Sequence, residues 1–337
     1  MFKKMKLKFL TAVVFCGFLA GNAWATGDAG LRAMQSRGKV FCGTDLNIGT
    51  YAYKDDDGIW RGIDTDLCRA IAAAIVGRPD NFTLKHVDAG EAGKALKEGL
   101  VDVMLGFAPY SANVELNRQY ALGALLYYDH QMFLTRDLEG ATSMESFKGK
   151  RVCTVTGSED LSNAQEYSNK YALDLKVHFY KTEGEARTAF LTKRCELLSG
   201  NEMQLKGIME KFGKNSKLVL IPEAIATKPV YAFVDSENVT LQFAVRWIIN
   251  ALALAELKEI NSKNVDLYTV DNNTSIKNLL GEDPKLWSRF FLKPEWVKTY
   301  VKEFGNYREV IDRNFKQPIK ENMLTKDGGA ITPLPFI

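Results

Sequence analysis

Apolar and polar positions repeat along the chain with two periods, one typical of strands and one typical of helices. A strand-like run near Lys39–Phe41 is followed by apolar residues at every fourth position from Ile63 to Ile75, which predict a helix ending at Gly77. The alternation then continues to Thr135. We expect strands near Phe82–Val87, Val101–Leu105 and Tyr127–Thr135, and helices near Glu91–Lys97 and Asn113–Tyr120. This order predicts an α/β unit.

The same alternation starts again at Arg151 and predicts a second α/β unit. We expect strands at Val152–Val155, Leu175–Tyr180, Glu196–Ser199 and Leu218–Ile221, with helices beginning near Ser158, Gly184 and Met203. After Pro229 the pattern offers one strand, Val230–Val234, and then mostly helix, including Leu241–Leu257 and Trp296–Phe304. One strand cannot form a third sheet, so this tail is expected to return to the first unit.

Two lobes joined by two crossings follow from this pattern. The crossings are expected near 134–136 and 229–233, so lobe 1 comprises 26–134 and 231–337, and lobe 2 comprises 135–230. Ligands of such α/β lobes bind at the carboxyl ends of the strands. A hinged binding cleft is therefore expected, with two rigidly docked domains as the alternative.

The first 25 residues have the three parts of a secretory signal peptide. A lysine-rich start is followed by the apolar stretch Phe9–Ala20 and the small-x-small site Ala23–Ala25. A membrane anchor is the alternative, but the stretch is shorter than the ~20 residues that span a bilayer. Removal of the segment takes away four lysines and no acid, so the net charge falls from +3 to −1. A near-neutral protein lacks the basic surface of a nucleic-acid binder.

Four cysteines remain after the signal peptide, and an even number in an exported chain favours disulfides. They allow three pairings, and the spacings favour Cys42 with Cys68 and Cys153 with Cys195, each within one lobe. A metal site is the alternative. The chain has no CxxC, and its three histidines are far apart, so we expect neither a metal nor a cofactor.

Several stretches in one order resemble the periplasmic general L-amino-acid-binding proteins of ABC transporters. They include GIWRGIDTDLCRAIAAAI from Gly58 to Ile75, KEGLVDVM from Lys97, Tyr127-Tyr128-Asp129 and VCTVTG from Val152. Arg194-Cys195, Val245-Arg246-Trp247 and Gly305-Asn306-Tyr307 continue the series. The resemblance implies a two-lobed, hinged periplasmic-binding-protein (Venus-flytrap) fold, each lobe a mixed sheet flanked by helices.

The residues that hold an amino acid in that family are replaced here. The carboxylate-binding Arg falls on Val114, the ammonium-binding Asp on Asn201, and a Thr after the Val-x-Thr-Gly motif on Glu159. Arg118 lies one helical turn after Val114 and is the candidate replacement anchor. The expected cleft is instead aromatic and acidic, which suits an organic cation. The ligand contacts we expect are Asp45, Tyr51, Phe107, Tyr110, Ser158, Glu159 and Asn201, with Tyr53 and Trp60 nearby.

The function that these observations predict is a monomeric periplasmic solute-binding protein without catalytic activity. It would deliver a small polar ligand, amino-acid-related or amine-like, to the inner-membrane permease of an ABC importer. Two alternatives remain open. One is a ligand sensor that docks on a membrane receptor, and the other is an enzyme like the periplasmic cyclohexadienyl dehydratases, with Glu159 as the acid.

Overall fold

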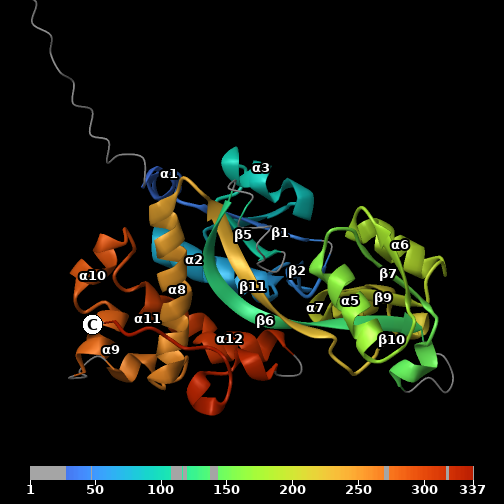
Figure 1. Ribbon diagram of the computed structural model, residues 1–337. Coiled ribbons are helices and arrows are strands. Elements are labelled where there is room, and N and C mark those ends of the chain that lie inside the picture. Colours follow the sequence, from blue (N-terminus) through green and yellow to red (C-terminus); the bar gives the residue numbers. More distant parts are fainter. Residues whose placement is uncertain are drawn as a thin grey trace, which may run out of the picture.

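Two α/β lobes lie side by side and share one continuous sheet (Figure 1). The computed structural model describes residues 28–336 except 47, 108–115, 117–119, 137–142, 269–272 and 316–318. The expected signal peptide and most of the expected helix Asn113–Tyr120 therefore lie outside the described residues. Within them the sheet has nine strands, in the order β4-β1-β5-β11-β6-β9-β7-β8, with β10 paired to β6.

Lobe 1 contains the parallel strands β1, β4 and β5 and most of the helices. Its strands are β1 (Val40–Thr44), β4 (Phe82–His86), β5 (Val103–Phe107) and the short hairpin β2 (Tyr53–Lys54) and β3 (Trp60–Arg61). Its helices are α1 (Ala29–Arg37), α2 (Ile63–Val76), α3 (Ala92–Lys97), α8 (Val239–Leu257), α9 (Thr274–Leu280), α10 (Pro284–Arg289), α11 (Trp296–Phe304) and α12 (Tyr307–Asn314). The helices after α8 pack in the same core as α2, so the tail does return to this lobe.

Helix α2 is the centre of lobe 1 because its apolar residues cover more than one face. Every residue from Ile63 to Ile75 is buried, and Gly77 ends the helix in the left-handed conformation. A disulfide joins Cys68 of α2 to Cys42 of β1. Helix α8 has the length and hydropathy of a membrane span, the one such helix among the described residues, but it packs against α2 and β6 in this core.

Lobe 2 is a smaller α/β unit. Its strands are β7 (Arg151–Val155), β8 (Lys176–Tyr180), β9 (Leu197–Asn201) and β10 (Leu218–Leu220), and its helices are α5 (Glu159–Lys170), α6 (Glu183–Leu191) and α7 (Glu202–Phe212). The second expected disulfide, Cys153–Cys195, is also present. Each disulfide therefore lies within a single lobe, Cys42–Cys68 in lobe 1 and Cys153–Cys195 in lobe 2, as the spacing predicts.

Two long antiparallel strands, β6 (Tyr120–Arg136) and β11 (Ala226–Asp235), run from one lobe into the other. They pair from Tyr120↔Asp235 to Gln131↔Ala226. From Gln131 to Thr135, β6 instead pairs with β9 of lobe 2, while Tyr231 and Phe233 of β11 pair with β5 of lobe 1. Strand β6 begins seven residues before the predicted Tyr127, because its first half pairs along the whole length of β11.

Candidate functional site

The two lobes touch where the loop after β1 meets helix α7. The hydroxyl of Thr50 donates a 2.6 Å hydrogen bond to the carbonyl of Met203. Gly207 of α7 permits this approach, because a Cβ at that position would lie 3.1 Å from the Ile48 side chain. The two lobes are therefore in direct contact beside the ends of β1 and β9.

Tyr51 lies in this contact and is buried, with 6% of its surface exposed. Its hydroxyl forms a side-chain hydrogen bond with Asn201, and the Asn201 Oδ1 atom is buried without a partner, so the amide nitrogen is the donor. Burial, together with the nearby carboxyls of Asp129 and Glu183, raises the pKa of Tyr51 well above its usual value. The neutral phenol of Tyr51 thus lies beside the Asn201 Oδ1 atom, which accepts no hydrogen bond.

Lobe 1 contributes two acids to this region. Asp45 follows β1, and its carboxylate lies 3.3 Å from Nδ1 of His86. Asp64, in the first turn of α2, is fully buried and accepts a 2.5 Å hydrogen bond from the Thr44 hydroxyl, while its Oδ1 has no partner. Burial raises the pKa of Asp64 to about 7, against the effect of Thr44.

Lobe 2 contributes acids from the starts of α5 and α6. Ser158 precedes α5, but its hydroxyl donates to the Val155 carbonyl at 2.7 Å and makes no cap bond to the helix. Glu159 is half-buried, and desolvation raises its pKa although Lys228 acts in the opposite direction. Glu183 remains open to solvent beside Gln204, yet the crowding of protein atoms around it and the carboxyl of Asp45 raise its pKa to about 7.

A buried charge cluster forms where β6 and β11 cross between the lobes. Lys228 and Asp129 are direct cross-strand neighbours and are both buried. The Lys228 ammonium makes an ion pair with Asp160 of α5, and Asp129 accepts hydrogen bonds from the backbone N–H groups of His130 and Met203. Burial raises the pKa of Asp129 to about 7, although Lys228 lowers it.

The ionisable side chains where the two lobes meet are therefore mostly carboxyls, of which Asp64, Asp129 and Glu183 have a pKa of about 7. Lys228 is the only buried lysine in the described part of the chain, and it is already paired. The carboxyls around it and Tyr51 are Asp45, Asp64, Asp129, Glu159, Asp160 and Glu183. Such a surface attracts a cation and repels an anion.

The structure brings together five of the predicted contacts: Asp45, Tyr51, Ser158, Glu159 and Asn201 lie at or beside the ends of strands β1, β7 and β9. Phe107 is the last residue of β5. Tyr110, Val114 and Arg118 lie outside the described residues. All of these ligand assignments remain predictions.

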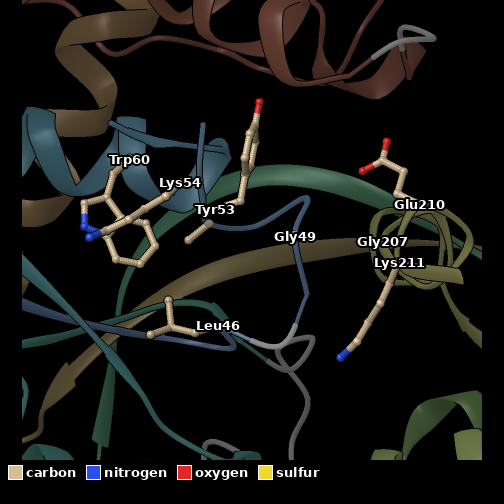
Figure 2. A pocket seen from close by; sticks show the side chains of 9 residues that line it. Leu46, Gly49, Tyr53, Lys54, Trp60, Gly207, Glu210 and Lys211 are labelled. Atoms are coloured by element: carbon tan, nitrogen blue, oxygen red, sulfur yellow. The ribbon is translucent and has the colours of Figure 1, made fainter. Parts of the chain in front are cut away.

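Tyr53 and Trp60 lie elsewhere, on an outer groove between the hairpin β2–β3 and helix α7. The groove has a volume of about 400 Å³ and also includes Leu46 and Lys211 (Figure 2). The Lys54 ammonium lies 5.3 Å from the centroid of the Trp60 ring. Tyr53 and Trp60 thus lie at the outer edge of the contact between the lobes, and the Tyr53 side chain is half exposed.

Sequence reasoning missed the charge cluster and assigned Glu159 alone as a lobe 2 charge in the cleft. Asp160 and Glu183 are two more. Lys228 lies two residues before the predicted strand Val230–Val234 and gave no signal of its own, whereas Asp129 stood in the Tyr-Tyr-Asp stretch. Their proximity depends on the register Lys228↔Asp129.

Comparison with known proteins gives relatives over most of the chain, although no family model matches it. The chain is 29% identical over 334 residues to the putative amino-acid ABC transporter-binding protein YhdW of Escherichia coli strain K12, covering 97% of both chains. It is 27% identical to the general L-amino acid-binding periplasmic protein AapJ of Rhizobium johnstonii, covering 94% of both.

A solved structure is also similar, that of a periplasmic binding protein of an ABC transporter from Brucella ovis with glutathione bound. Its TM-score is 0.82 at 28% identity, and the match covers 90% of this chain and 98% of that chain. The relatives confirm the resemblance drawn from the sequence motifs. The two-lobed periplasmic-binding-protein fold is likewise confirmed.

Proposed function

We propose that this protein is a periplasmic solute-binding protein that closes on a small polar solute carrying an ammonium group and presents it to the permease of an ABC importer. The observation that carries the proposal is the group of carboxyls from both lobes around Tyr51 and Lys228, where the lobes meet. Burial of an ammonium costs several kcal/mol unless acids surround it. The relatives named for L-amino acids and for glutathione support only the ammonium part of this chemistry, because those ligands also carry carboxylates.

The contacts proposed for the ammonium come from both lobes. The face of the Tyr51 ring offers a cation–π contact, and the unpartnered Oδ1 of Asn201 offers an acceptor. Glu159 and Asp45 supply negative charge on the two sides. A ligand that contacts both lobes favours closure by the difference between its affinities for the closed and open states.

The proposed hinge is the stretch in which β6 and β11 pair with each other between the two lobes, at 127–131 and 226–230. The boundaries predicted from sequence, 134/135 and 230/231, lie on the same strands. We also propose that the protein works as a monomer after removal of residues 1–25. Its relatives are binding proteins, and we propose that it performs no chemistry on the ligand.

Isothermal titration calorimetry with agmatine, cadaverine, choline and the common amino acids tests this function. We expect at least one ammonium compound to bind with micromolar affinity, equivalent to about −8 kcal/mol. Glu159→Gln should weaken that compound about tenfold, because it removes a cleft charge. The matched control is Asp174→Asn, which removes a surface acid paired with Lys176 and should have no effect. Absence of binding by every compound of this panel, with micromolar binding of a matched solute that lacks an ammonium group, such as succinate or glucose, would overturn the proposal.

A further inference from the structure

Lys228 is the only buried lysine among the described residues, and its ammonium makes an ion pair with Asp160. The side chain of Lys228 is 4% exposed and that of Asp160 is 15% exposed. Asp160 is the second residue of α5, so its carboxylate also lies at the positive end of that twelve-residue helix. A lysine and a helix start together form the surroundings that a bound carboxylate requires.

The main chain of Asp160 is fixed against β6. The side-chain amide of Gln131 donates to the Asp160 carbonyl at 3.0 Å and to the Ser199 hydroxyl at 2.8 Å. Asn163, one turn further along α5, donates to the Gln131 carbonyl oxygen at 2.8 Å. These bonds fix the backbone from which the Asp160 carboxylate reaches Lys228.

We propose that Asp160 is a specificity-determining residue that fills, on Lys228, the position a ligand carboxylate would otherwise take. The cleft then accepts amines and rejects molecules that bring a free carboxylate to this position. Two observations support this. Lys228 has no charge left to neutralise a second anion, and the next acids, Glu159 and Asp129, would repel it. This inference rests on the proposed function only for the identity of the ligand.

Chemical rescue tests the assignment without knowledge of the ligand. Asp160→Ala removes the carboxylate and leaves a space beside Lys228 that formate can enter. We expect formate, compared with chloride at equal ionic strength, to raise the melting temperature of Asp160→Ala and to bind it about tenfold more tightly than the unaltered protein. If the variant does not fold alone, formate in the refolding buffer should restore folding.

Two controls make the rescue specific. The double variant Asp160→Ala/Lys228→Met lacks the ammonium and should show no formate effect. Asp174→Ala removes an acid from a surface lysine pair and should behave like the unaltered protein. Absence of rescue, or equal rescue in the double variant, would overturn the assignment and leave the proposed function intact.

Selectivity is measured with agmatine and L-arginine, which differ only by the α-carboxylate. We expect the affinity ratio of agmatine to arginine to fall at least about tenfold in Asp160→Ala. The same ratio should change less in Glu159→Gln, which removes a cleft charge that is not bonded to Lys228. Rescue by formate with an unchanged ratio, or no measurable arginine binding by Asp160→Ala, would overturn the selectivity claim.

Discussion

Replacement of Asp64 by Asn should flatten the dependence of stability on pH. Asp64 is fully buried at the start of α2, and its Oδ1 has no partner. Burial raises its pKa to about 7, whereas in the unfolded chain an Asp has a pKa of about 3.9. The folded protein therefore holds this proton over a range of pH in which the unfolded chain has lost it.

The sign and size of the effect follow from proton linkage. A carboxyl with a raised pKa costs nothing well below pH ~3.9, reduces stability as the pH rises through this value, and reaches its full cost above pH 7. With these two pKa values, the free energy of unfolding falls by about 2.6 kcal/mol between pH 5 and pH 8 through Asp64 alone. Asp129, with a pKa also about 7, acts in the same direction.

Urea unfolding at pH 5 and pH 8 measures the difference in free energy for the unaltered protein and for Asp64→Asn. We expect the loss between the two pH values to be smaller in the variant by about 2 to 3 kcal/mol, because an amide does not titrate in this range. Asp56→Asn, in the exposed turn before β3, is the matched control and should leave the loss unchanged. Equal losses in the unaltered protein and in Asp64→Asn would refute the reasoning.

Three further variants test other parts of the structure by urea unfolding. Replacing Cys153 and Cys195 together by Ser should lower stability by about 4 kcal/mol, since the bridge closes a separation of 42 residues; no loss would speak against the pairing. Asn306→Ala should cost about 1 kcal/mol, because it removes the capping box of α12, and an unchanged midpoint would contradict this. His130→Gln should cost about 1 kcal/mol at pH 5.5 and less at pH 8.5. Contact with Glu202 raises the His130 pKa, so the stabilisation is complete below pH 6.5 and is lost as the pH rises through the folded value; a constant cost would rule this out.

The fold could be predicted from the sequence wherever periodicity was strong. Helix α2 matched its expected bounds because apolar residues recur at every turn, and the disulfides followed from the even number of cysteines and from the spacings that keep each pair within one lobe. Strand β6 was predicted too short, because residues 120–126 gain their strand conformation from pairing with β11, more than 100 residues later. Such long-range pairing leaves little local signal.

The candidate site could be predicted where it depends on strand ends, but not where it depends on long-range strand register. Carboxyl ends of parallel strands converge, so Asp45, Ser158 and Asn201 were expected near one another. Lys228 was not, because it lies within β11 and meets Asp160 only through the register of two crossing strands and the start of α5. The sequence shows Lys228 as an isolated charge just before the predicted strand Val230–Val234 and does not show its partner.

Native mass spectrometry of the protein released from the periplasm, followed by denaturation and identification of the small molecule it carries, tests the central claim most directly. The account predicts a bound solute that contains an amine or quaternary ammonium group, retained by the unaltered protein and depleted from Glu159→Gln. Recovery of a solute without a cationic group, held equally by both proteins, would contradict it.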